Sequence, residues 1–450
     1  MTIDELPDVA LLKIYDFYVE ARTEVWYTLV QVCRKWRSVV FGSPRRLDLR
    51  LYCTASTPVR ETLDVWPCLP IVVWGNGHQM WGVDNIVAAL EHNDRICELG
   101  LRPVTGSQFK RVLAAMQQPF PALTRLELQH RGETVLVDGD SFLGGSAPRL
   151  QTLWLDRIPI SGLPKLLLSA TDLVHLILWR IPHSGYISPE ALVTCLSALT
   201  RLERLHIGFQ SPRSRPDQRN RRPPPTTRTL LPVLTKLRFK GVDKYLEDVV
   251  SRIDAPLLDN LNITFFHQLI FDTPQLTRFI SRTPKFRARD EARVVFSDWD
   301  VSVSLPHTLD GTLELTISCR HSDWQLSSLA QVCSLSFLRA LIPTVEHLYV
   351  QVGYSLLRWQ DDIENSLWFE LFDPFTAVKD LYLSSEFASR ISPALQTLTG
   401  ERATEVLPAL QSLFLQGSRP SENVQEAVGR FVAARQLSKR PVAVSRWEGE

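Results

Sequence analysis

Several features that mark common classes of protein are missing from this sequence of 450 residues. No uninterrupted apolar run reaches the roughly 18 residues that suggest a membrane-spanning helix. The first residues, MTIDELPDV, carry acids where a signal peptide carries bases. Neither sign of charge prevails, because 50 Lys and Arg residues face 49 Asp and Glu residues. We therefore expect a chain that is not secreted, does not span a bilayer, and has no overall field that attracts nucleic acid or a membrane surface.

Cysteine lacks any pattern in this chain. The seven cysteines are odd in number, widely scattered and never spaced as C-x-x-C. This distribution argues against a disulfide framework and against a zinc site, and it favours a reducing intracellular compartment, cytoplasmic or nuclear. The cysteines are Cys33, Cys53, Cys68, Cys97, Cys195, Cys319 and Cys333.

Catalytic motifs are also missing. The sequence holds no G-x-S-x-G, no phosphate-binding loop and no zinc-ligand spacing. Asp361, Asp362 and Glu364 are candidate metal ligands or paired acids, but they precede an apolar helical stretch, where an acidic helix cap is the more common role. We therefore assign no catalytic residue, no metal and no cofactor, and we expect a protein that is not an enzyme.

What the sequence does contain is a repeat. The pattern apolar-x-x-apolar-x-apolar occurs ten times, and most neighbouring copies begin between 23 and 35 residues apart. In an extended segment the last two apolar positions point to one face, so each copy predicts a strand that is buried on one side. The copies begin at Ile96, Leu123, Leu150, Leu173, Leu202, Leu234, Leu258, Val345, Val378 and Leu410.

Helix-like stretches separate the predicted strands. They begin at helix-start residues, which are Asp84, Ser188 before Pro189, Asp243 and Ser421. One strand and one helix per unit, repeated, predict an α/β fold in the form of an irregular leucine-rich-repeat solenoid with parallel strands. An ordinary α/β sheet with leucine-rich strands is the alternative. His130, His175 and His206 lie in or beside these strands and are interpreted as unrelated side chains, although strand neighbours can form ladders.

Two segments interrupt the repeat. Between 258 and 345, "ARVVFSDWDVSVSLP" and "GTLELTISC" resemble strands of a degenerate or inserted unit. Residues 211–228 hold six arginines, five prolines and one acid, which predicts a disordered loop. That loop is either a spacer or a nuclear-import or phosphate-docking segment.

The first 48 residues lie outside the repeat. Pro7, Leu11, Ile14 and Tyr18 fall on one helical stripe, and a second stripe runs from Trp26 to Val40 before Gly42 and Pro44. About 45 residues cannot bury so many apolar side chains among themselves. We therefore expect this module to be covered by something else, and the basic residues around Trp36 to be a solvated helix end and not a nucleic-acid site.

These residues carry a resemblance to a known family. "LPDVALLKIYDF" followed by "WYTLVQVCRKWRSVVF" resembles an F-box, with Leu-Pro at the start and Val-Cys-basic-x-Trp at the matching distance. The chain as a whole is similar to F-box and leucine-rich-repeat proteins of mushroom-forming fungi. The departures are Val9, where the family often has an acid, and the small Ala10.

The resemblance implies a substrate receptor of a cullin-RING ubiquitin ligase of the SCF type. Its F-box of three short helices would bind a Skp-family adaptor, and through it a cullin, while the repeats hold a protein substrate. A scaffold that binds the adaptor without a cullin remains the alternative. The implied adaptor-binding residues are Leu6, Pro7, Leu11, Ile14, Val32, Cys33 and Trp36, and for Trp36 internal packing among the three small helices is the alternative. The implied domains are 1–48 (F-box), 49–95 (connecting segment and N-terminal cap), 96–418 (repeats) and 419–450 (C-terminal capping helix and tail).

The substrate surface is expected on strand positions that face away from the core. The residue between the last two anchors becomes aromatic toward the C-terminus, at Tyr349, Tyr382 and Phe414. Aromatic side chains are favoured interface anchors, so we predict that these three contact the substrate. Coverage by the helix expected over 421–435, or by helix–strand packing, is the alternative.

Overall fold

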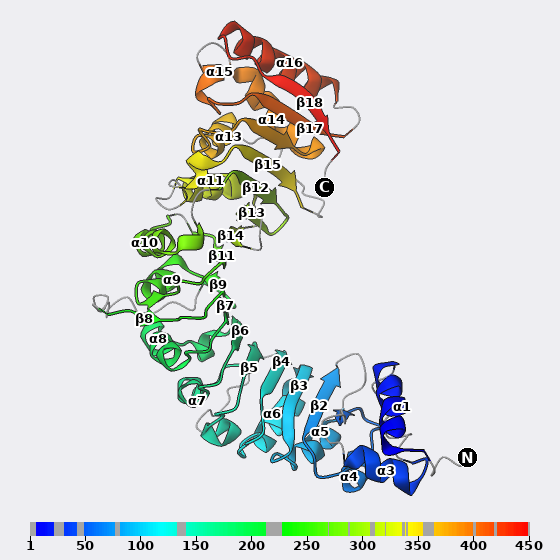
Figure 1. The fold of residues 1–450 in the computed structure, drawn as a ribbon. Coiled ribbons are helices and arrows are strands. Elements are labelled where there is room, and N and C mark those ends of the chain that lie inside the picture. Colours follow the sequence, from blue (N-terminus) through cyan, green and yellow to red (C-terminus); the bar gives the residue numbers. More distant parts are fainter. Residues whose placement is uncertain are drawn as a thin grey trace. The chain divides into compact units, whose positions relative to one another are not determined.

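The structure is a computed structural model in which the chain forms two compact units, Met1–Tyr186 and Ile187–Glu450. Each unit is described by itself below. Figure 1 colours the chain by sequence. The structure describes residues 6–21, 31–42, 49–76, 82–132, 141–212, 227–268, 270–286, 289–306, 311–319, 321–334, 338, 341–353, 364–398, 402–417 and 421–448.

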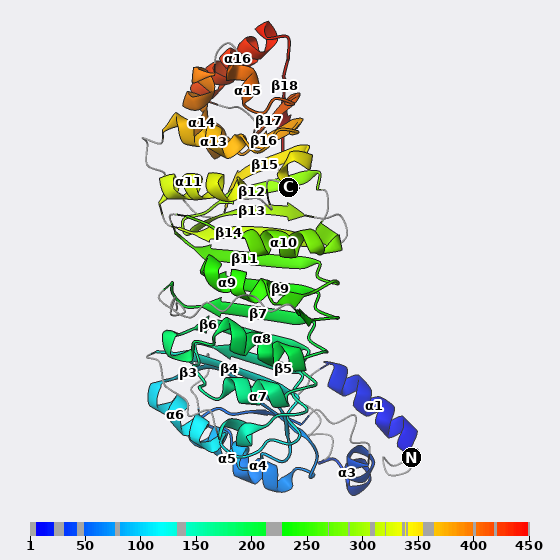
Figure 2. The ribbon, with the colours of Figure 1, turned by 90° about the vertical axis from the view of Figure 1, so that its left-hand side faces the viewer.

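The first unit alternates helices and strands. All five neighbouring pairs in the strand order β1-β2-β3-β4-β5-β6 are parallel, as repeats that place a crossover segment between successive strands require. Helix α5 contacts both α4 and α6, and helices α4 to α7 lie on one side of the strands (Figure 2). The elements are α1 (Asp8–Ala21), α3 (Arg34–Phe41), β1 (Arg50–Tyr52), α4 (Val59–Val65), β2 (Ile71–Asn76), α5 (Val83–Leu90), β3 (Ile96–Thr105), α6 (Gly106–Ala115), β4 (Arg125–Arg131), β5 (Thr152–Asp156), α7 (Leu163–Ser169) and β6 (His175–Ile181), with short 3-10 turns at Phe142–Gly145 and His183–Gly185.

The second unit continues the same alternation. Its main strands follow the order β7-β9-β11-β14-β13-β12-β15-β16-β17-β18, and β8 pairs with β10 beside them. The elements are α8 (Pro189–Ala198), β7 (Arg204–Phe209), β8 (Thr229–Leu230), β9 (Lys236–Gly241), α9 (Asp243–Val250), β10 (Ile253–Asp254), β11 (Asn260–Phe266), α10 (Pro274–Arg282), η6 (Pro284–Phe286), β12 (Glu291–Phe296), β13 (Asp300–Pro306), β14 (Thr312–Ser318), α11 (Ser322–Cys333), η7 (Ile342–Thr344), β15 (His347–Val352), α13 (Asn365–Phe372), β16 (Asp380–Leu383), α14 (Ser385–Thr397), α15 (Arg402–Glu405), β17 (Ser412–Gln416), α16 (Glu422–Leu437) and β18 (Ala443–Trp447).

The core is made of the repeat anchors. Every apolar anchor of the ten copies is buried, and the most exposed of them, Leu415, is only 5% exposed. Because strand side chains alternate between faces, the residue between the last two anchors points away from this core. The strand–helix repeat and the parallel strands predicted from the sequence are therefore confirmed in outline, and the architecture is consistent with a leucine-rich-repeat solenoid.

The helix-start residues differ in how they act. Ser188 caps α8 through its hydroxyl, which accepts from the Ala191 N–H at 3.2 Å, while Pro189 occupies the first helical position. Asp243 is the first residue of α9 and accepts from the Lys244 N–H at 2.6 Å. Asp84 lies inside the first turn of α5, and Ser421 makes no side-chain cap at α16. For all four helices, the start predicted from a serine or aspartate before an apolar run lies within one or two residues of the observed start.

The predicted parallel arrangement fails at one place, the stretch interpreted from the sequence as a degenerate or inserted unit. Strand β13 is antiparallel to both β12 and β14, whereas β14 is parallel to β11 and β12 is parallel to β15. The inserted unit is therefore a three-stranded meander laid into the sheet in reverse order. The physical reason is that the loops after β12 and β13 are too short to hold a crossover helix, so each strand must turn back on its neighbour.

Candidate functional site

The N-terminal module presents the first candidate surface. Helices α1 and α3 contact each other, and the side chains buried there are Leu11, Tyr15, Trp36 and Val40. The Lys35 ammonium ties the second helix to the start of the first, because it donates to the Leu6 carbonyl at 2.7 Å. The two helices thus bury one apolar seam between them.

The structure divides the predicted adaptor-binding residues into two groups. Leu11 and Trp36 are only 1% and 4% exposed, so they support the module from within. Pro7 and Val32 are exposed, while Leu6, Ile14 and Cys33 are half-buried. The residues from Trp26 to Val30, which begin the second predicted stripe, lie outside the described residues, as does the side chain of Tyr18.

Two exposed apolar residues of this module are missing from the adaptor-binding set predicted from the sequence. Val9 is 67% exposed and Phe17 is 72% exposed, both on α1, and Val32 before α3 is 48% exposed. Three large exposed apolar side chains on one small module make it a candidate interaction surface. The signal was present in the sequence, since Val9 and Phe17 lie off the stripe that contains Leu11 and Ile14.

The outward face of the first unit's strands forms the second candidate surface. The register confirms the row of residues expected between the anchors, in which Gly100, Glu127, Trp154 and Ile177 stand side by side on β3, β4, β5 and β6. A Cβ at Gly100 would overlap the indole of Trp74 on β2, so only glycine lets that ring lie flat across the strand.

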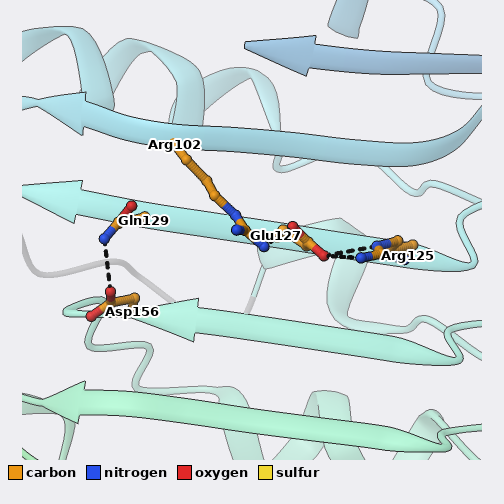
Figure 3. A network of polar contacts seen from close by, with 5 residues as sticks. All are labelled: Arg102, Arg125, Glu127, Gln129 and Asp156. Carbon is orange, nitrogen blue, oxygen red and sulfur yellow. Dashed lines mark hydrogen bonds and ion pairs between the residues drawn. The ribbon is translucent and has the colours of Figure 1, made fainter. Parts of the chain in front are cut away.

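A buried carboxylate lies at the centre of this row. Glu127 is only 2% exposed although it faces away from the leucine core. It is paired with two arginines: Arg125 donates through Nε at 2.8 Å, and the Arg102 guanidinium reaches it from β3 (Figure 3). A charge taken out of water requires such partners, and here two cations share one anion.

A second buried carboxylate lies on the neighbouring strand. Asp156 is 1% exposed and accepts from Gln129 at 3.0 Å (Figure 3) and from Arg180 Nε at 2.7 Å. Arg180 can reach it because its backbone is left-handed, with φ of 51°, at a position where a regular strand would turn the side chain toward the core. The hydrogen bond to Asp156 raises the pKa of Arg180 and so secures its charge.

Tryptophan rings lie beneath both arginines. The Arg102 guanidinium carbon lies 3.2 Å from the centroid of the Trp154 ring, and that of Arg125 lies 6.0 Å from Trp74. Stacking of this kind combines cation–π attraction with loss of rotamer freedom. Burial lowers the pKa of Arg102, and the adjacent Glu127 charge opposes that shift. The face therefore displays ordered guanidinium groups over hidden carboxylates.

The aromatic positions predicted near the C-terminus do come together. Tyr349 and Tyr382 stack with ring centroids 4.2 Å apart, and Tyr382 and Phe414 stack at 4.4 Å. Their register on β15, β16 and β17 sets this ladder, and Arg293 on β12 lies 5.2 Å from the Tyr349 ring. The three rings face away from the anchors and are half-buried, so the core packing offered as an alternative is not what covers them.

What partly covers the ladder comes from the end of the chain. Trp447 on β18 packs edge-on against Tyr349 and Tyr382, at 5.7 and 5.5 Å. Helix α16, the other proposed cover, instead buries Phe431 on the core side beside Leu381 and Leu413. Burial, with help from neighbouring Tyr382, raises the pKa of Tyr349 to about 12, so both phenols stay neutral and act as hydrogen-bonding groups.

The remaining residues singled out in the sequence do not form a site. His130 is buried on the core side, where its ring centroid lies 4.7 Å from that of Phe109. His175 lies on the opposite face of the sheet beside Thr152, so these two histidines form no ladder. Burial, and then the charge of Arg238, lowers the pKa of His206 to about 4. Within the described part of the chain, no group of three or more His, Cys, Asp or Glu side chains could hold a metal ion.

Two sequence interpretations fall partly outside the structure. Asp361 and Asp362 lie outside the described residues, and Glu364 precedes α13 without capping it through its side chain. Of the basic loop, residues 213–226 likewise lie outside them. None of the helices in the described ranges combines the length and apolar character needed to cross a bilayer.

Comparisons with known proteins add little to this picture. No family model and no curated protein matches the chain. Among solved structures, it is similar to the leucine-rich-repeat-containing protein LegL7 of Legionella pneumophila, with 12% sequence identity, a TM-score of 0.28, and coverage of 87% of this chain and 98% of that one. The fold assignment therefore depends on the repeat that the chain itself displays.

Proposed function

We propose that this chain is a protein-interaction subunit that serves as the substrate receptor of a cullin-RING ubiquitin ligase of the SCF type. Residues 1–48 bind the Skp-family adaptor, and the outward strand faces bind a protein substrate. The observation that carries this proposal is the exposure of Val9, Phe17 and Val32 on the module that resembles an F-box. Burying three such side chains against a partner would contribute about 1.5 to 3 kcal/mol each.

The buried contacts between α1 and α3 support this role, because they leave other side chains of the module for a partner. Leu11, Trp36 and Val40 fix the angle between α1 and α3, while Lys35 binds the Leu6 carbonyl and so holds the Leu-Pro entry in place. An adaptor that docks on the outer side then meets a preformed surface and pays little ordering entropy. In this machine the chain makes no covalent bond with its substrate and instead raises the local concentration of a substrate lysine near the ubiquitin-loaded enzyme.

The test is a pull-down of the full chain from cells, read for adaptor and for cullin. We expect a variant with Val9→Ser, Phe17→Ser and Val32→Ser to lose both, because interface anchors of this kind cost about 2 kcal/mol or more each when truncated. Leu6→Ala with Pro7→Ala should weaken capture in the same direction.

A matched control separates docking from general surface polarity. Val65 and Leu168 are also apolar, 78% and 46% exposed, and lie elsewhere in the first unit. Val65→Ser with Leu168→Ser should retain both partners. Adaptor captured without cullin would replace the ligase role by the scaffold role, and capture of neither by the unaltered chain would refute both.

A further inference from the structure

The outward face of the first unit has an uneven balance of charge. Its carboxylates are Glu98, Glu127 and Asp156, and two of these are almost completely buried. Its arginines outnumber them, and of these three carboxylates only Glu98, which is half-buried, is within reach of a partner. The arginines are Arg50, Arg102, Arg125, Arg131 and Arg180.

The spare charge is localised. Glu127 neutralises only one of its two partners, so Arg102, Glu127 and Arg125 together keep one positive charge, while Arg180 and Asp156 cancel. Glu98 on β3 stands opposite Arg125 in the strand register and is the acid nearest to that charge along the ladder. Arg131 adds an exposed positive charge on β4, two positions beyond Gln129 on the same side of the strand. The side chains of Arg102 and Arg125 remain 35% and 46% exposed, and because Arg102 Nε is buried, it is the terminal nitrogens of Arg102 that a partner can reach.

The arginines are already ordered before any partner arrives. Arg102 lies between the Trp154 ring and Glu127, and Arg125 is held mainly by Glu127, with the Trp74 ring centroid 6.0 Å away. A planar guanidinium that is held in one orientation binds a carboxylate with two parallel hydrogen bonds at a reduced entropic cost. Since Arg102 covers the face of Trp154, that ring is not open for stacking on a nucleic-acid base.

We propose that this face binds an acidic segment of a protein partner, with Asp or Glu carboxylates placed on Arg102 with Arg125 and on Arg131. The proposal deepens the proposed function, in which that partner is the substrate. Single spare charges at separate points match single carboxylates better than they match one doubly charged phosphate. A strand-like segment can present them, since alternate side chains of an extended chain point the same way.

The experiment measures the fluorescence anisotropy of a labelled peptide of alternating Glu and Ser, titrated with the full chain at low salt. Alternating Gln and Ser is the neutral probe. We expect the acidic peptide to bind, the neutral one not to bind, and added salt to weaken binding. The double variant Arg102→Gln with Glu127→Gln should weaken binding about tenfold, because it removes the ordered guanidinium without changing net charge.

The matched control is Asp84→Asn with Arg111→Gln. These changes remove an ion pair between helices α5 and α6 of the same unit, in which the Arg111 and Asp84 charged atoms lie 2.5 Å apart. The control variant should bind the acidic peptide like the unaltered chain. If the double variant on the sheet face fails to fold, the exposed change Arg131→Gln decides, with an expected loss of about threefold.

Several results would overturn the proposal. The proposal fails if the acidic peptide does not bind, or if the control variant weakens its binding as much as the Arg102 and Glu127 variant does. It also fails if a phosphoserine–serine peptide binds more tightly than the acidic peptide, or if oligothymidine binding is weakened equally by the Arg102 and Glu127 variant. The ligase role is tested separately, since it predicts adaptor capture whether or not the acidic peptide binds. Adaptor capture with no peptide binding would remove this proposal alone, and peptide binding with no adaptor capture would remove the ligase role alone.

Discussion

The outward faces of the two units use different chemistry on the same kind of scaffold. In the first unit, the residues between the anchors include Glu127, which is buried under arginines. In the second unit, the corresponding positions at Tyr349, Tyr382 and Phe414 form a stack of rings. A repeat thus fixes where a side chain stands and leaves open what it is. The difference teaches that a polar face derives its order from specific pairing, whereas an aromatic face derives it from contact area.

Removing one partner of a buried pair should give the largest effect. Arg180→Ala leaves Asp156 buried with only Gln129 still donating to it among the pairings described above, and should lower the free energy of unfolding by about 3 kcal/mol. Urea unfolding measures this. The exposed pair of Arg60 and Glu91 is the matched control, and Arg60→Ala should cost about 0.5 kcal/mol. Equal costs for the two variants would remove the distinction between buried and exposed pairing.

Breaking the middle of the aromatic ladder should have a smaller effect. Tyr382→Ala removes two ring stacks at once and should cost about 2 kcal/mol, since each aromatic pair contributes about 0.5–1.5 kcal/mol beyond burial. Tyr382→Phe keeps the stacks and should be nearly neutral by the same urea measurement. A large loss in the phenylalanine variant would show that the hydroxyl, and not the ring, holds this face together.

A buried acid without an arginine sharpens the comparison. Glu247 accepts from the Gln275 and Leu276 N–H groups at 2.8 and 2.7 Å, and burial raises its pKa to about 7. The folded state therefore holds a proton that the unfolded chain loses near pH 4.5, so this stabilisation is complete at low pH and is lost as pH rises through about 7.

The change Glu247→Gln tests whether this group makes the protein less stable as pH rises. The unaltered chain should lose stability between pH 5 and 7 with a slope of up to about 1.4 kcal/mol per pH unit from this group, and the glutamine variant should lack that contribution. Glu426→Gln, on the exposed side of α16, is the control and should keep the slope. Identical pH profiles for the Glu247 variant and the unaltered chain would contradict the assignment.

The smallest effect is expected from a tryptophan under an arginine. Trp154→Leu keeps an apolar side chain on β5 but removes the ring beneath Arg102, and should cost about 1 kcal/mol. Its unfolding should be compared with that of Trp299→Leu, a ring that is 57% exposed. A loss at Trp299 as large as that at Trp154 would mean that the stacked arginine contributes nothing measurable.

The sequence was informative where one periodicity repeats. The spacing of Leu126 and Leu128, copied at Leu153 and Leu155, implies the register that brings Glu127 beside Trp154, and the structure has that register. The partners of these residues could not be read in the same way. Arg102 follows Leu101, where the pairing of β3 with β4 shifts, and Arg180 depends on one left-handed residue. Both are local departures from regularity, which a repeat pattern does not encode.

The N-terminal module illustrates a different limit. Helical periodicity correctly placed Leu11 on a stripe with Ile14, but it could not tell whether that stripe faces inward or outward. In the structure Leu11 is buried, and Val9 and Phe17 from the other side of α1 are exposed. An amphipathic pattern shows that two sides of a helix differ; which side the second helix covers is decided by the angle at which α3 packs.

The reversed meander of β12, β13 and β14 also affects how the second unit assembles. In a simple repeat array each strand docks on the one made just before it, so the array can add or lose units one at a time. Here β11 ends at Phe266, and its neighbour β14 begins only at Thr312, after two other strands have been laid down. Residues far apart in sequence must meet before either side is complete, which slows folding and makes this stretch melt as a single block. Partial unravelling from the C-terminal end should therefore stop at the meander.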